Sequence, residues 1–567
     1  MSLSLIGLAY ALFSAAIGFG VLFVAARDVV DVATLRRFGI AWVIVAVGLF
    51  VIPNGGLFLV FGVAFFTALT LSARGEPLEW AALLVCAAPA AGVAIFNLPF
   101  GINYLLDFSF AMFLSIGLLV PIVMRRLGGA RLSGAGAIDA LMILFFVLVV
   151  LLDARDATLT TAMRNATKWF LLGVAPYLAF SRGLTSVTRL RGVQAAFLAA
   201  MIVLSVICIF GAVTGWRPYD VPERQLFDSW GYSYLYRGGL LRNGATMASS
   251  PITLGCMLLI GAAFLFAFAD KIRHRWQFLA LLGVLGLGFL GSFSRGPIVG
   301  VVVGVIAFQL TRPNPLPALI RTGAVGAVLL VPVLLFTEPG RTIIATLPFI
   351  GTDEASAGSV DYRAELFRQG LKQIGRFPLF GTTTYREQPE MVSMIQGEGI
   401  VDIVNSYLRW ALQYGLVTTT AYVAALVLAA LQLFAVIRRL DPARPDQAAA
   451  RYALGGVFAA LVGLGFTLAT MSQTNLVPYL TYMMMGVNVG ALRVGKAALR
   501  APLPSATADA PAVVAAETEA RAPDPADAEP EPLAPPAPPA PRPASSFGLQ
   551  TPLDFDLGPL TPKPQDR

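Results

Sequence analysis

The sequence has little charge for its length. Of its 567 residues, 13% are charged, against about 25% in an average soluble domain. Hydrophobic residues make up 57%, and the mean hydropathy is +0.73. Transmembrane helices are expected, because a chain in lipid has to satisfy its backbone polar groups internally. A membrane barrel would need short alternating segments, and the apolar runs here are long and continuous. The composition therefore predicts an all-α, polytopic membrane protein.

Histidine and cysteine are also scarce. The one histidine, His274, lies in a polar turn. The three cysteines are dispersed through apolar runs, at Cys86, Cys208 and Cys256. This spacing fits neither a metal site nor a disulfide framework, so we expect no metal and no cofactor. The net charge of +8 does not indicate nucleic-acid binding, because excess Lys and Arg in a membrane protein mostly encodes its orientation.

Apolar segments recur from residue 3 to residue 494, and their lengths predict 12 to 15 spans. Basic residues concentrate in every second loop, whereas the short loops 53–56 and 472–475 have none. The positive-inside rule places the basic loops and the C-terminus in the cytoplasm. The same parity places the long loop 338–403 outside. The basic loop 154–168 does not fit this pattern.

The composition changes abruptly after Arg500. Residues 501–546 are mostly Ala and Pro with scattered acids, a composition that cannot form a packed core. We therefore divide the chain into a transmembrane domain, residues 1–500, and a disordered cytoplasmic tail rich in Ala and Pro, residues 501–567.

The centres of the spans nearly lack ionisable residues, which mark ion paths and proton relays in membrane proteins. This absence argues against an ion-coupled transporter or a voltage-gated channel, and it assigns any chemistry to the outer loops. Gly300 and Gly304 have the small-xxx-small spacing that lets membrane helices approach closely.

Four segments stand out from this background. Segment 237–255 is a basic loop that contains Arg242 and enters a span, and segment 292–296 places Arg295 at a helix junction. Segment 361–381 contains Arg363 in an amphipathic helix predicted to lie on the outer membrane–water boundary. Its expected apolar face is formed by Ala364, Phe367, Leu371 and Ile374. Segment 402–416 leads from Asp402 and Asn405 back into the membrane.

In this order, the four segments resemble the O-antigen ligase and O-antigen polymerase family of bacterial envelope glycosyltransferases, over roughly residues 235–435. The resemblance implies a metal-independent transfer of a glycan from undecaprenyl pyrophosphate to an acceptor at the outer, periplasmic face of the inner membrane. Its implied partners are the lipid-linked glycan, membrane lipid, a flippase and a chain-length regulator.

Arginines suit this chemistry, because cleaving a sugar–pyrophosphate bond leaves a multiply charged anion that guanidinium groups bind bidentately. Two or three charge-assisted hydrogen bonds, worth about 1.5–3 kcal/mol each, could replace a cation. We therefore expect Arg242, Arg295 and Arg363 to bind the pyrophosphate. The alternative for Arg295 is that it only reaches towards lipid head groups.

One departure from the family pattern affects the predicted activity. In the ligases of this family, a histidine precedes the Asn of the motif, and this histidine is thought to act on the acceptor hydroxyl as a general base. This chain has Val404 before Asn405 instead. Asp402 is the nearest carboxylate, so Asp402 and Asn405 are the catalytic candidates. Asp402 could instead be an ordinary solvated loop acid.

The missing histidine favours a polymerase that joins lipid-linked repeat units into O-antigen or exopolysaccharide. Ligation of the finished glycan to lipid A-core or another acceptor is the alternative. A polysaccharide or lipid transporter is the third hypothesis, disfavoured because the sequence contains no internal repeat of the kind found in alternating-access carriers.

Overall fold

The computed structural model describes residues 2–72, 76–88, 94–95, 107–127, 136–222, 236–237, 240–246, 250–336, 341, 354–395, 401–472 and 476–500. Their regular secondary structure is helical apart from four two-residue strands, so the all-α prediction is confirmed. The predicted tail, 501–567, lies outside the described residues, as do most of residues 338–353. The division into domains therefore stays a prediction.

The first half of the chain contains helices α1 (Ser2–Ala25), α2 (Val32–Val51), α3 (Gly55–Leu71), α4 (Pro77–Leu84), α5 (Phe110–Leu114), α6 (Val120–Leu127), α7 (Gly136–Asp153), α8 (Leu159–Trp169), α9 (Ala175–Gly183) and α10 (Val187–Thr214). Two π-helical turns, η1 (Ser115–Leu119) and η2 (Phe170–Val174), join α5 to α6 and α8 to α9. Strands β1 (Ala94–Ile95) and β2 (Asp107–Phe108) pair antiparallel.

The second half contains α12 (Pro251–Ala267), α13 (Arg275–Ser292), α14 (Arg295–Leu310), α15 (Pro315–Phe336), α17 (Glu354–Arg376), α18 (Pro389–Val392), α19 (Ser406–Arg439), α20 (Pro445–Leu468) and α21 (Val477–Arg500). A short 3-10 turn, η4, covers Tyr385–Glu387. Strands β3 (Tyr236–Arg237) and β4 (Leu240–Leu241) form a second antiparallel pair.

Seven helices in the described part of the chain are long and apolar enough to cross a membrane: α1, α2, α7, α10, α13, α19 and α20. Four shorter apolar helical segments accompany them: Gly55–Leu71, Phe110–Arg125, Pro251–Ala267 and Arg295–Leu310. Because a span needs about 20 residues, the shorter segments fall at or below the usual limit. The total of 12 to 15 spans stays a prediction.

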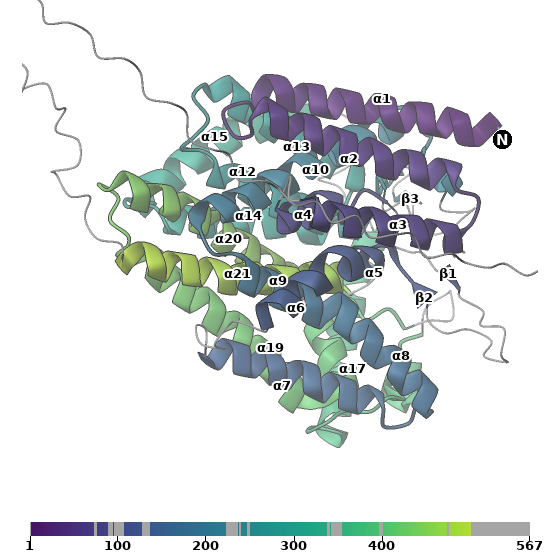
Figure 1. Ribbon diagram of the computed structural model, residues 1–567. Coiled ribbons are helices and arrows are strands. Elements are labelled where there is room, and N and C mark those ends of the chain that lie inside the picture. The colour runs from purple at the N-terminus through teal and green to yellow at the C-terminus, as the bar shows by residue number, and fades with distance from the viewer. Residues whose placement is uncertain are drawn as a thin grey trace, which may run out of the picture. The chain divides into compact units, whose positions relative to one another are not determined.

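Small residues bring α14 and α20 into close contact, and the two helices run side by side in Figure 1. A Cβ atom on Gly304 would lie 3.0 Å from the carbonyl oxygen of Ala459. A Cβ on Gly300 would lie 3.0 Å from the carbonyl oxygen of Gly463. The helix packing predicted from the Gly300–Gly304 spacing is therefore confirmed, since larger side chains would separate the backbones.

The long helices share two ends, which we call the outer and inner ends after the orientation predicted from the basic loops. The outer end holds the start of α14 and of α19 and the end of α20, where the Ser406 hydroxyl donates to the carbonyl of Met471 at 2.7 Å. The inner end holds the end of α12, where Asp270 pairs with Arg191 at 2.6 Å. Which end faces the cytoplasm stays a prediction.

Helix α17 confirms the predicted helix in segment 361–381, and a second apolar side accompanies the expected one. Ile374 is buried, whereas Phe367 and Leu371 are 50% and 51% exposed. The side buried against α19 instead carries Leu366 and Gly370, because a Cβ on Gly370 would lie 2.8 Å from Leu408. The helix therefore has one apolar side packed on protein and another left open.

Candidate functional site

Arg242 is fixed between helix ends rather than in an open loop. Its side chain is 6% exposed. Its Nε lies 3.5 Å from the carbonyl oxygen of Ser292, and one terminal nitrogen donates to the hydroxyl of Ser294 at 3.3 Å. The next residue, Asn243, donates its backbone N–H to the carbonyl of Gly291 at 2.9 Å. The first predicted segment is therefore joined directly to the second.

Arg295 is the first residue of α14 and is half-buried. It follows Ser294, whose hydroxyl donates to the carbonyl of Pro251 at 2.9 Å and so also binds the start of α12. A Cβ on the next residue, Gly296, would lie 2.6 Å from the hydroxyl of Thr470. The Ser-Arg-Gly sequence is thus enclosed by α12 and by the end of α20.

Asp402 lies at the same outer end. Its Oδ1 is 3.2 Å from the hydroxyl oxygen of Ser472, two residues beyond Thr470. The same hydroxyl also lies 2.5 Å from the carbonyl oxygen of Ile403. Asp402 is half-buried, so one carboxylate oxygen is positioned by a neutral group while the residue keeps access to its surroundings.

Asn405 has a structural task in this arrangement. It is the N-cap of α19, and its Oδ1 accepts the backbone N–H of Leu408 at 3.1 Å. An N-cap of this kind satisfies one of the otherwise unpaired amides of the first helical turn. Val404, in the place of the family histidine, lies between Asp402 and this cap.

Arg363 lies on α17, and its side chain is exposed. Its neighbour Tyr362 connects α17 to the site, because its hydroxyl lies 3.2 Å from the carbonyl oxygen of Asp402 and 3.3 Å from that of Met394. Burial and then the charge of Asp402 raise the pKa of Tyr362. The structure therefore links Arg242 to the residue before Arg295, holds Asp402 at the same outer end through Ser472, and leaves Arg363 on an exposed helix surface.

The Pro378-Leu-Phe-Gly381 turn interlocks with a break in α19. Gly415 has a φ of +76° inside α19, and the N–H of Leu416 donates to the carbonyl of Pro378 at 2.8 Å. Gly381 has a φ of +60°. A Cβ on Gly415 would lie 2.2 Å from the carbonyl oxygen of Leu379, so both the left-handed backbone and the close approach require glycine.

Arg155 explains the basic loop that did not fit the positive-inside pattern. Its guanidinium donates to the carbonyls of Gly381 and Gln413, each at 3.2 Å. Nearby, Asp153 accepts from Trp169 Nε1 at 2.7 Å and lies 3.4 Å from the Gln413 side-chain nitrogen. Sequence reasoning missed both residues. The charge of Arg155, in a loop predicted to be outside, was the available signal.

His274 cannot replace the missing histidine of the family pattern. It is the residue before α13 at the inner end, and α13 ends at Ser292 beside Arg242. At 1.5 Å per residue, the 18 residues of α13 separate the two ends by about 27 Å. The described residues hold no group of three or more His, Cys, Asp or Glu that could bind a metal ion.

The helical fold and its apolar helices of membrane-spanning length define an integral membrane protein, with the predicted site residues Arg242, Arg295 and Asp402 at its outer end. Residues 278–423 match the family model described as O-antigen ligase. This match confirms the resemblance to the O-antigen ligase family that the sequence motifs indicated. It includes Arg295, Arg363 and Asp402, whereas Arg242 precedes it. A search of curated proteins found no match. The family implies a membrane enzyme that transfers a glycosyl group from a lipid-linked glycan.

Proposed function

We propose that this protein is a glycosyltransferase of the bacterial inner membrane that polymerises undecaprenyl-pyrophosphate-linked repeat units into O-antigen or exopolysaccharide. Its active site is the outer end, which faces the periplasm, and its C-terminus is cytoplasmic. The O-antigen ligase match supports the class of reaction. The polymerase assignment rests on Val404, which stands where a ligase has its histidine.

The observation that carries the proposal is a continuous set of contacts around the outer end. Arg242 bonds to Ser294, the residue before Arg295. Gly296 packs against Thr470, and Ser472 bonds to Asp402. Two arginines and one carboxylate from segments far apart in sequence therefore surround the junction of α12, α14, α19 and α20.

In the proposed reaction, Arg295 and Arg242 bind the pyrophosphate oxygens of the donor, with the N-terminal amides of α14 adding a favourable dipole. An acceptor sugar hydroxyl attacks the anomeric carbon of the donor glycan. The bond from that carbon to the pyrophosphate oxygen breaks, and undecaprenyl pyrophosphate leaves as an anion. Asp402 takes the proton of the attacking hydroxyl. No metal is required, because the arginines stabilise the leaving group.

Two further residues support this site. Arg363 extends the basic surface along α17 and contacts the outer phosphate or the glycan. Asn405 positions Asp402 by fixing the start of α19 through its N-cap. A flippase that delivers the donor and a regulator of chain length remain the expected partners.

A ligase is the second candidate, favoured by the name of the matching family. A deletion strain compared with its parent distinguishes the polymerase from the ligase. Surface glycans and polyprenyl-linked glycans are extracted from both strains, and their chain lengths are measured. For a polymerase we expect single repeat units on the lipid carrier. Full-length polymer that accumulates on the carrier without reaching an acceptor would contradict the proposal and identify a ligase. Unchanged glycans in both fractions would exclude both.

A further inference from the structure

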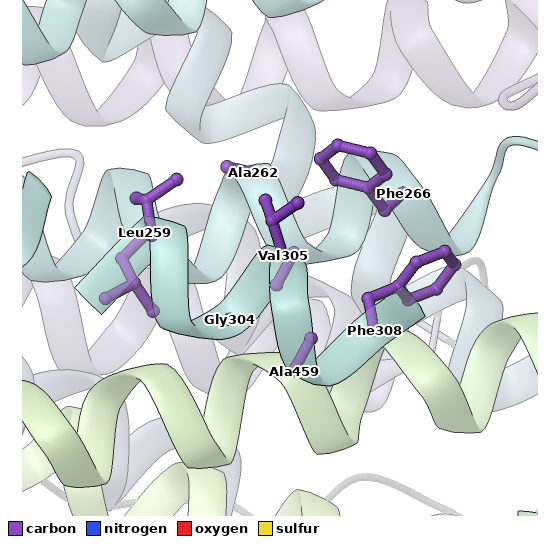
Figure 2. Close-up of a pocket in the computed structure, with 9 residues that line it drawn as sticks. Leu259, Ala262, Phe266, Gly304, Val305, Phe308 and Ala459 are labelled. Carbon is purple, nitrogen blue, oxygen red and sulfur yellow. The ribbon is translucent and has the colours of Figure 1, made fainter. Parts of the chain in front are cut away.

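A shallow apolar groove lies between α12, α14 and α20, away from the outer end. It is lined by nine residues, all apolar, and its cavity volume is only about 10 Å³. Figure 2 shows Val305 of α14 and Phe266 of α12 at this groove, with Ala459 of α20 below it. Val305 is only partly buried, so the groove lies at the surface of the helix bundle.

The groove ends at an arginine. Phe308, its last lining residue on α14, packs against Phe266 with ring centroids 5.5 Å apart. The guanidinium carbon of Arg312 lies 5.9 Å from the centroid of the Phe308 ring and 4.0 Å from that of Tyr452. An apolar surface thus passes directly into a cationic one at the inner end.

Arg312 belongs to a cluster of three arginines, with Arg438 and Arg451. Arg438 donates to the backbone carbonyl of Arg312 at 3.1 Å. Arg451, 6% exposed, donates to the carbonyls of Thr311 at 2.9 Å and Leu440 at 3.1 Å. Arg438 and Arg312 both act electrostatically on Arg451. Three positive charges therefore gather around one helix end.

Within the described residues, no carboxylate forms an ion pair with any of these three arginines. The acids nearest in sequence to Arg438 and Arg451 have other partners: Asp441 accepts the backbone N–H of Ala443 at 2.9 Å, and Asp446 pairs with Arg444. By contrast, Arg191 at the same end is paired with Asp270. Neighbouring like charges repel, and basic pockets between helices on the cytoplasmic side bind anionic lipid head groups.

We propose that the groove and this arginine cluster form a binding site for one anionic phospholipid of the inner leaflet. The phosphate lies against Arg312, Arg438 and Arg451, and an acyl chain runs along the groove past Phe308 to Val305. The order of the two surfaces, cationic at the helix ends and apolar further into the bundle, matches that of a phospholipid. This site is independent of the reaction proposed at the outer end.

The test is lipid retention by the full-length protein reconstituted in nanodiscs with phosphatidylglycerol and phosphatidylcholine, then released into detergent and analysed by native mass spectrometry. The wild type should retain phosphatidylglycerol in preference to phosphatidylcholine. In the double variant R312A/R438A, affinity for phosphatidylglycerol should fall about tenfold or more, because two charge-assisted contacts are lost. The matched control R36A/R125A removes two exposed inner-end charges on α2 and α6 and should retain the lipid.

Val305→Phe tests the groove separately, without changing charge, and keeps the proposal testable if the arginine variant does not fold. It should weaken retention of phosphatidylglycerol and leave binding of inorganic phosphate unchanged. Equal retention of both lipids by the wild type would overturn the proposal, as would an equal loss in R36A/R125A. Unchanged phosphatidylglycerol retention in Val305→Phe, or preferential retention of added undecaprenyl phosphate, would exclude an acyl-chain site for phospholipid.

Discussion

Asp139 at the inner end and Asp402 at the outer end are both tied to other segments, but their partners differ. Asp139 is enclosed by Arg182 at 2.8 Å, Arg493 at 3.5 Å and the hydroxyl of Tyr177 at 2.5 Å. Asp402 is half-buried and accepts from the neutral hydroxyl of Ser472. A carboxylate surrounded by cations holds helices together, whereas one oriented by a hydroxyl retains lone pairs for a substrate proton.

Asp402→Asn tests most directly whether Asp402, unlike Asp139, acts in catalysis. The carboxamide oxygen can still accept from Ser472, so the loop should keep its structure, but an amide cannot take a proton. Removing a general base costs typically 10²–10⁴-fold in rate, and we expect a loss of this order in glycan transfer by purified membranes. Transfer within a factor of about three of the wild type would show that Asp402 is only a loop acid.

Asp139→Ala should act on stability instead. It leaves the buried Arg182 and the partly buried Arg493 without their acid, and removing one partner of a buried pair costs about 3–5 kcal/mol. Thermal unfolding in detergent should show a large fall in Tm. Any residual folded protein should transfer glycan at a normal rate per molecule, since the inner end contacts no substrate. An unchanged Tm would contradict the proposal that Asp139 stabilises the helix contacts at the inner end.

Arg295→Ala tests whether the arginines at the outer end bind the pyrophosphate. If Arg295 binds the pyrophosphate, loss of one charge-assisted contact of about 1.5–3 kcal/mol should lower kcat/KM about 10- to 100-fold with a small change in Tm. The matched control is Arg368→Ala, which removes a guanidinium that is 67% exposed and paired with Glu365 on α17. Equal activity of both variants would mean that Arg295 only reaches lipid head groups.

Gly415→Ala tests the interlock that supports the site. Alanine at a φ of +76° is strained, and its Cβ would collide with the carbonyl of Leu379, so we expect a loss of about 1–3 kcal/mol. Gly375→Ala in α17 is the control, because a Cβ there meets nothing within 4 Å and helix propensity favours alanine. The two variants should shift Tm in opposite directions. A shift of the same sign would contradict this account.

Sequence reasoning recovered the helical class and the family resemblance, whereas the site roles of Arg242, Arg295 and Asp402 stay predictions. These predictions were possible because apolar runs and a single Arg between spans are local signals. The charge of Arg155 could be noticed, but its acceptors, Gly381 and Gln413, could not be predicted, since they are 226 and 258 residues away. The side of α17 that packs on α19 was not predicted either, because Leu366 and Phe367 are equally apolar and only tertiary contacts choose between them.

The smallest effect on Tm is expected on the exposed side of α17, which contains neither Asp139 nor Asp402. Hydrogen bonds from Gln369 and then Arg368 lower the pKa of Glu365. A lowered folded pKa means that the contribution to stability is present above the ordinary pKa and is lost as pH falls through the folded value. The Tm of the wild type should therefore exceed that of Glu365→Gln slightly at about pH 7, and the difference should shrink as the pH falls below the ordinary pKa of a glutamate. A difference that grew on acidification would contradict the lowered pKa, because protonation removes the charge that these two donors stabilise.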